Sequence, residues 1–139
     1  MVLKGLFSRF NVPVLKRALD AASLRQTTIA SNLANIETPH YRRKKVVFES
    51  AMRKALNSEA LSGFVTNPRH IRIGGEGVNN VQPKVIEDKS RNNVSGVNNV
   101  DVDQEMAGLA KNQLYYAFSA KLIAIQFNRI KEAINERAR

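Results

Sequence analysis

The sequence predicts a mainly α protein in which long N- and C-terminal helices pair as a coiled coil, with an irregular, partly disordered middle segment containing a little β structure. Apolar residues alternate at intervals of four and three over residues 13–37 and again over residues 101–137, a spacing that places them on one helix face. Residues 38–100 lack this pattern and are rich in turn-forming residues. We therefore expect two helices joined by a loop-rich segment and preceded by a flexible segment, residues 1–12.

The N-terminal helix is expected to begin at Pro13 and to end before Pro39. Proline suits the first helical turn, where its missing N–H costs nothing, and Thr38 is disfavoured in the α conformation because a proline follows it. The stripe is apolar except at Gln26. Its apolar members are Leu15, Leu19, Ala22, Ile29, Leu33 and Ile36. The pattern predicts an amphipathic helix with one face directed towards a partner.

The C-terminal helix has a natural N-cap in Asp101, and Asp103 and Glu105 place negative charge at the positive end of its dipole. Its stripe comprises Val102, Met106, Leu109, Gln113, Tyr116, Ala120, Ile123, Phe127, Ile130 and Ile134. A second stripe comprises Leu114, Phe118, Leu122 and Ile125. Because one partner helix would not cover both stripes, the excess apolar surface is expected to contact other subunits.

The two helices differ in length. At a rise of about 1.5 Å per residue, residues 101–137 extend about 55 Å, whereas residues 13–36 extend about 36 Å. A helix of that length exceeds the width of a compact domain of this mass. The overhang predicts that another chain covers it, which favours an assembly over a self-contained globule.

The middle segment, residues 38–100, is expected to form turns and short elements. Its prolines, a glycine-rich run at 74–77 and three Asn-Asn pairs are typical of loops. Residues 48–61 are predicted to form a short helix, and residues 70–73 and 81–86 short strands.

Composition excludes several kinds of chemistry. The chain has 139 residues and no cysteine, so disulfides, thiolate metal sites and cysteine nucleophiles are absent. No apolar run is long enough to span a bilayer, and early basic residues such as Lys4 and Arg9 argue against a cleaved signal peptide. No nucleophile–base pair or set of metal ligands is recognisable. We expect neither an enzyme nor a cofactor.

The positive charge leaves a second class of protein open. Lys and Arg number 22 against 12 Asp and Glu, a formal charge of +10, which attracts polyanions. The basic cluster at residues 42–45 lacks interleaved aromatic residues, and no nucleic-acid-binding motif accompanies it. We interpret the cluster as a solvated or subunit-facing charge run. A basic nucleic-acid-binding protein is the alternative, and it predicts binding that weakens steeply with salt.

Two asparagines three positions apart, Asn32 and Asn35, lie just before the expected end of the first helix. Asparagine is a poor residue for a helix interior because its amide competes for backbone groups. We therefore expect these amides to bond a neighbouring backbone near the helix end. The alternative is an ordinary polar face that runs into a C-cap.

Residues 31–42 closely resemble the signature of flagellar axial proteins, N-L-A-N-x-x-T-P-G-Y. The matching positions are Asn32, Leu33, Ala34, Asn35, Thr38, Pro39 and Tyr41. The tract Thr-Asn-Pro-Arg-His-Ile at 66–71 and the run from Asn98 to Tyr116 are similar to elements of that family's proximal rod subunits. His40 stands where the family usually has glycine, so either the turn tolerates histidine or its geometry differs locally.

The resemblance implies a structural subunit of the bacterial flagellar basal body that is exported by the flagellar type III apparatus without a cleaved signal and polymerises into the periplasmic rod. It implies self-association, contacts with the rod proteins FlgC and FlgF and the adaptor FliE, and an export element for which Phe10 to Val14 is a candidate. The apolar stripes predict an assembly seam. Its residues are Leu15, Leu19, Ile29, Leu33, Met106, Leu109, Tyr116, Ile123, Phe127 and Ile130.

Overall fold

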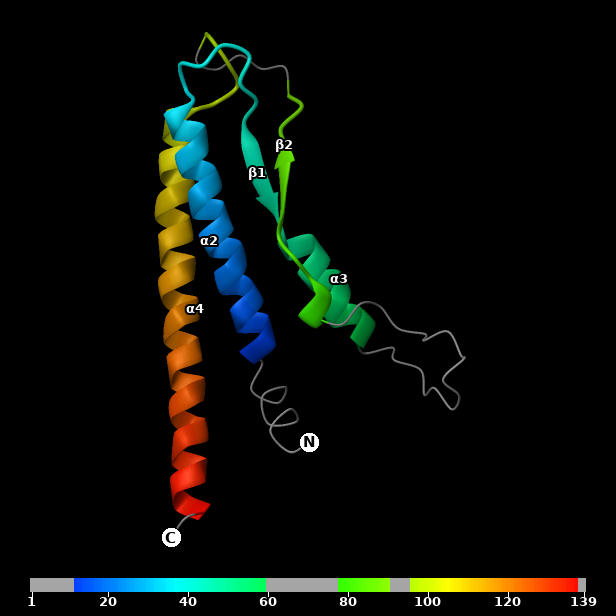
Figure 1. The fold of residues 1–139 in the computed structure, drawn as a ribbon, viewed down its shortest axis with the longest axis vertical. Coiled ribbons are helices and arrows are strands. Elements are labelled where there is room, and N and C mark those ends of the chain that lie inside the picture. The colour runs from blue at the N-terminus through cyan, green and yellow to red at the C-terminus, as the bar shows by residue number, and fades with distance from the viewer. Residues whose placement is uncertain (1–11, 60–77, 91–95, 138–139) are drawn as a thin grey trace, which may run out of the picture.

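The computed structural model describes residues 12–59, 78–90 and 96–137. Its elements, in chain order, are α2 (Val12–Ala34), β1 (Lys44–Val47), α3 (Glu49–Glu59), the 3-10 turn η1 (Val78–Asn80), β2 (Lys84–Glu87) and α4 (Val102–Arg137). Helices α2 and α4 lie side by side and antiparallel, and β1, β2 and α3 lie beyond α2 on the side away from α4 (Figure 1). The predicted mainly α class is confirmed, and the helix pair is consistent with a coiled coil.

The helices differ in length as expected. Helix α4 has 36 residues and α2 has 23, which correspond to about 54 and 34 Å. The C-terminal part of α4 extends well past the start of α2 (Figure 1). Within the described ranges, no helix is long and apolar enough to cross a membrane.

Helix α2 ends at Ala34, three residues before the predicted end at residue 37. Beyond it the chain tightens, with the N–H of Asn35 donating to the carbonyl of Asn32 at 3.2 Å. The side chain of Asn98 donates to the carbonyls of Asn35 and Ile36 at 2.9 and 2.8 Å. An amide from elsewhere in the chain thus binds carbonyls just beyond the helix end, where the carbonyl of Asn35 also accepts from the N–H of Thr38 at 3.1 Å.

Helix α4 begins with the predicted cap. The Oδ1 atom of Asp101 accepts hydrogen bonds from the N–H groups of Asp103 and Gln104 at 3.0 and 3.2 Å. These two N–H groups belong to the first turn, where no carbonyl of the helix can reach them.

Strands β1 and β2, which α3 and η1 separate in sequence, form a two-stranded antiparallel sheet in which Lys44 pairs with Glu87 and Val47 with Lys84. The sequence did not predict β1, because this strand has only four residues and two of them are lysines, which are uncommon in strands. The strand predicted at 81–86 is shifted to Lys84–Glu87, since Pro83 cannot donate to a ladder. The strand predicted at 70–73 lies outside the described residues.

A small core fills the space where α2, α3 and η1 meet. Its buried side chains are Ala21, Phe48, Met52, Ala55, Val78 and Val81. Val14, at the start of α2, packs against this cluster. The core therefore connects α2 to the middle segment, whereas α4 is held by other means.

The face of α4 towards α2 includes a row of polar residues beside its apolar ones. Glu105 and Asn112 are 2% and 0% exposed, and Ser119 and Gln126 continue the same seven-residue spacing in half-buried positions. The amide of Asn112 donates to the carbonyl of Ala22 on α2 at 2.8 Å. Such polar groups in a helix interface fix its register at a cost in stability. The interface thus differs from the purely apolar seam of an ordinary coiled coil.

Replacement of Asn112 by leucine is expected to raise the free energy of unfolding by about 1 kcal/mol. The Oδ1 atom of Asn112 is buried without a hydrogen-bond partner, whereas a leucine leaves nothing unpaired. Urea unfolding followed by circular dichroism measures the change. Asn112→Ala is the matched control and should gain less, because it leaves a void. A less stable Asn112→Leu protein would mean that the bond to the Ala22 carbonyl outweighs the unpaired oxygen.

Candidate functional site

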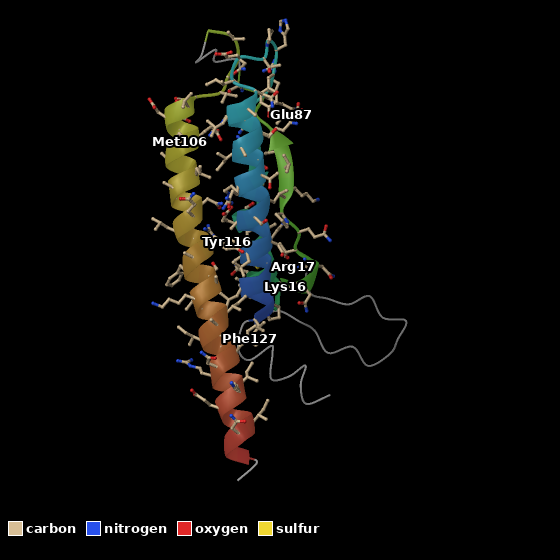
Figure 2. The ribbon with its side chains drawn as sticks, turned by 60° about the vertical axis from the view of Figure 1, so that its left-hand side comes forward. Lys16, Arg17, Glu87, Met106, Tyr116 and Phe127 are labelled. Carbon is tan, nitrogen blue, oxygen red and sulfur yellow. The ribbon has the colours of Figure 1, made fainter. Side chains whose placement is uncertain are left out.

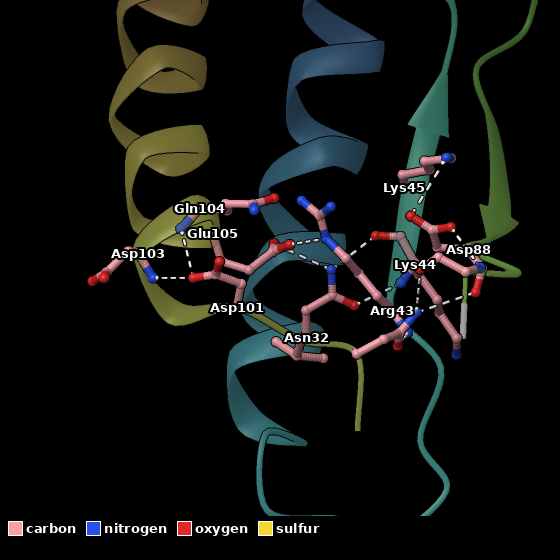
Figure 3. Close-up of polar contacts among 12 residues, drawn as sticks. Asn32, Arg43, Lys44, Lys45, Asp88, Asp101, Asp103, Gln104 and Glu105 are labelled. Atoms are coloured by element: carbon pink, nitrogen blue, oxygen red, sulfur yellow. Dashed lines mark hydrogen bonds and ion pairs between the residues drawn. The ribbon is translucent and has the colours of Figure 1, made fainter. Parts of the chain in front are cut away.

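The site is a polar junction at the end of α2, where α2, β1 and α4 meet (Figure 3). Its central residue is Asn32, which is 0% exposed. The Nδ2 of Asn32 donates to the carbonyl of Lys44 at 2.8 Å, and its Oδ1 accepts from the N–H of Lys44 at 2.9 Å. The side-chain amide therefore pairs with β1 as the peptide group of a further strand would. The expectation that this amide bonds a neighbouring backbone is confirmed.

A buried carboxylate on α4 joins the same junction. The Oε2 of Glu105 accepts from Asn32 at 3.1 Å, and its Oε1 accepts from the Nε of Arg43 at 2.5 Å. The hydroxyl of Tyr41 donates to the Oδ1 of Asn32 at 3.1 Å. Each oxygen of Glu105 has a donor, so the buried charge is compensated. The sequence predicts a role for Glu105 at the helix dipole, and nothing in it gives the partners of this carboxylate.

The Asn98–Asn99 pair completes the junction. The Nδ2 of Asn98 also donates to the carbonyl of Thr38 at 3.1 Å, which extends its cap on α2 into the turn. The Oδ1 of Asn99 accepts from the N–H of Arg43 at 2.8 Å, and its Nδ2 donates to the carbonyl of Asp88 at 3.2 Å. Asn99 thus bridges the two strands where their ladder ends. The sequence indicates loop chemistry for this pair and its place at the start of the run that resembles rod subunits, but not these bonds.

The turn after α2 places His40 in the left-handed region, with φ at 61°. The N–H of Tyr41 donates to the carbonyl of Thr38 at 3.3 Å across Pro39 and His40. A β-turn with proline second and positive φ third is typical of type II, which favours glycine in that third position. Histidine therefore adopts the conformation for which the family signature uses glycine.

Replacement of His40 by glycine is expected to raise the free energy of unfolding by about 0.5–1 kcal/mol. Glycine removes the left-handed penalty of about 1–2 kcal/mol but adds freedom to the unfolded chain. Thermal unfolding measures the effect. His40→Ala keeps a Cβ atom and should give no gain, and equal stabilisation by both variants would show that the imidazole, not the backbone, carries the strain.

Two carboxyl groups outside the junction have lowered pKa values. The pKa of Asp88 falls because the backbone N–H of Ser90 donates to it and Lys45 lies at 3.5 Å. Burial alone would raise the pKa of Glu49, but hydrogen bonds from its own backbone and from Arg25 outweigh burial and lower it. A lowered pKa stabilises the folded chain above the ordinary carboxyl pKa, and this contribution is lost as the pH falls through the lowered value.

The residues of the predicted assembly seam fall into two groups. Those buried or half-buried in one chain are Leu15, Leu19, Ile29, Leu33, Leu109, Ile123 and Ile130. Those exposed are Met106, Tyr116 and Phe127, spread along α4 (Figure 2). Most of the second stripe is also open, with Leu114 and Phe118 74% and 63% exposed, whereas Leu122 is half-buried. Val14 packs against the core, while its proposed export partner Phe10 lies outside the described residues.

The basic cluster at 42–45 is partly neutralised. Arg43 pairs with Glu105 and Lys45 with Asp88, while Arg42 donates to the carbonyl of Ser90 at 3.1 Å. Half of its charges are thus engaged within the chain. Among the described residues, no group of three metal-ligating side chains comes together. The junction is a set of closed hydrogen bonds that hold three elements in place.

Comparisons with known proteins agree with this architecture. A family model described as "Flagella basal body rod protein" matches residues 14–42, which include Asn32 and the turn. Two relatives named "Flagellar basal body rod protein FlgB" come from Borrelia hermsii and Borreliella burgdorferi. They are 34% and 37% identical, over 89% and 82% of this chain and 95% and 87% of their own. A third relative of the same name, from Bacillus subtilis, is 32% identical over 86% of this chain and 89% of its own length.

These matches define the class of the protein: it is a structural component of the flagellar basal body rod. This class is a family of structural proteins and not of enzymes. The chain belongs to the FlgB family of flagellar basal body rod proteins. The resemblance drawn from residues 31–42 is confirmed.

Proposed function

We propose that the chain is exported through the flagellar type III apparatus without a cleaved signal and polymerises into the proximal rod of the periplasmic drive shaft. Membership of the rod family supports assembly with other rod components. The finer contacts that we propose are with copies of itself, with FlgC and FlgF above and with FliE and the export apparatus below.

The observation that carries this proposal is the apolar surface that one chain leaves uncovered on α4. By helical periodicity, Leu114, Phe118 and Ile125 project from the side opposite Glu105 and Asn112. All three are exposed in the single chain. Burial of one such side chain contributes about 1.5–3 kcal/mol, so packing these residues against neighbouring helices would stabilise an assembly. Contiguous exposed apolar surface of this kind is typical of interaction surfaces.

The fold is also compatible with passage through a narrow channel. Val14 packs against the core of the folded chain. An export gate that recognises the Phe10 to Val14 element would therefore have to bind it before the chain folds. The core is small, and the α2–α4 interface contains buried polar groups, which favours low stability outside an assembly. We infer that the chain travels unfolded and acquires its full set of contacts in the rod.

Purified flagellar basal bodies from a strain that carries a tagged chain provide the test. The expected result is a fixed amount of tag per basal body that survives a high-salt wash, and retention of the tag in the cytoplasm when type III export is blocked. Leu33→Asp or Ile123→Asp should remove it from basal bodies. A chain absent from basal bodies and bound to nucleic acid in the cytoplasm would overturn the proposal and favour the alternative class.

A further inference from the structure

The two outer edges of the β1–β2 sheet differ in how far their backbone groups are hydrogen-bonded. The outer edge of β1 is occupied at Lys44, since the amide of Asn32 bonds both the N–H and the carbonyl of that residue. The N–H of Asp88 donates to the carbonyl of Arg43 at 2.7 Å, which fixes the alternation of bonded pairs along the ladder. By that alternation the N–H and carbonyl groups of Val85 and Glu87 point away from β1. They form the outer edge of β2.

No other described element covers this outer edge. Strand β2 lies on the far side of β1 from α2 (Figure 1), and all four of its residues are exposed. Val85 and Ile86 are 44% and 41% exposed, although both are β-branched and suit a packed strand. A two-stranded sheet has little stability of its own, and a third strand with apolar contacts adds to it. Among the described residues, no group bonds the backbone at this edge, and apolar surface lies beside it.

The charges around the edge specify the kind of strand that fits. Lys84 is the first residue of β2, and Lys89 and Arg42 lie just beyond the other end of the two-stranded sheet. All three are exposed. Of the nearby carboxylates, Asp88 is already paired with Lys45, which leaves Glu87 as the acidic residue on the strand. Positive charge on an edge strand repels an identical basic edge and so acts against pairing of copies. It favours a strand that has carboxylates.

We propose that the outer edge of β2 is a strand-addition site that binds an extended acidic segment of a partner protein. The backbone groups of Val85 and Glu87 would hydrogen-bond the added strand, and apolar residues of that strand would lie beside Val85 and Ile86. Carboxylates of the added strand would lie near Lys84 and Lys89. This mode combines main-chain hydrogen bonds for affinity with side chains for selectivity. The site is separate from the apolar stripes of α4 and does not depend on the proposed function.

A short synthetic peptide that alternates glutamate and valine is the probe, and a peptide with lysine in place of glutamate is its control. Each is titrated to about 1 mM into the full-length ¹⁵N-labelled chain. With the acidic peptide we expect amide shifts centred on Val85 and Glu87 and slower hydrogen exchange at both. Shifts on the helices instead, no shift at all, or equal effects of both peptides would overturn the proposal. So would equal competition by single-stranded DNA, which would indicate a general polyanion surface.

Two variants separate the edge from the surrounding charge. Val85→Pro removes an outward N–H and should weaken the acidic peptide about tenfold, whereas Val85→Thr keeps that N–H and should bind as the parent does. Proline is tolerated where a strand N–H faces solvent, and an unchanged pattern of amide resonances elsewhere checks the fold. Lys84→Glu combined with Lys89→Glu leaves the backbone intact and should reverse the preference between the peptides. Unchanged preference in that variant would contradict the assignment.

Discussion

Replacement of Asn32 by aspartate is expected to lower the free energy of unfolding by at least about 3 kcal/mol, because it removes the amide at the centre of the junction. The Nδ2 donor to Lys44 and to Glu105 disappears, and a second carboxylate is introduced beside that of Glu105. Leaving a buried charge without a partner costs about 3–5 kcal/mol. For a chain with so small a core, a loss of this size approaches the whole stability.

Chemical unfolding followed by circular dichroism measures the change. Asn128→Asp, on an exposed turn of α4, is the matched control and should alter stability by no more than about 0.5 kcal/mol. The double variant Asn32→Asp, Glu105→Gln restores one donor and one acceptor between α2 and α4. It should recover part of the loss, and a double-mutant cycle then gives the coupling between the two positions. Equal costs for Asn32→Asp and Asn128→Asp would show that the junction does not hold the fold.

Most of the architecture could be predicted from local patterns. The four-and-three alternation locates both helices, and the Asp101 cap sets the start of α4, because these features depend on neighbours within a turn or two. The β1–β2 sheet could not be predicted from such local patterns. Its first strand is short, and Asn32 pairs with it through a side chain twelve residues away. Such a contact leaves no periodic signal.

Only part of the junction could be predicted from the sequence, for the same reason. The unusual placement of Asn32 and Asn35 just before the expected end of the first helix indicated amides engaged with backbone, whereas the role of Glu105 depends on Asn32, at a separation of 73 residues. The facing of α4 was also hidden. An apolar stripe is normally assigned to the nearest partner helix, yet here a row of polar residues is buried against α2 while Leu114 and Phe118 are exposed. Surface reserved for other subunits and surface used within the chain look alike in a sequence.

The stripe that faces away from α2 is the basis of the second large effect. Phe118→Asp is expected to abolish incorporation into the rod and with it motility, while the purified chain keeps its fold. The side chain is 63% exposed, so a charge there costs the single chain little. In an assembly, the same aspartate would be buried between helices without a partner, at a cost of several kcal/mol. The loss would recur at every copy of the subunit.

Swimming in soft agar and the amount of tagged chain in basal bodies measure this effect, and circular dichroism of the purified variant establishes that it folds. Gln113→Asp introduces the same charge at an exposed polar position of α4 and should leave motility intact. Ile123→Asp is a weaker test by itself, since Ile123 is half-buried in one chain and its replacement also disturbs folding. Normal motility of the Phe118→Asp strain would mean that this stripe faces solvent in the rod, and that Met106, Tyr116 and Phe127 carry the contact between subunits.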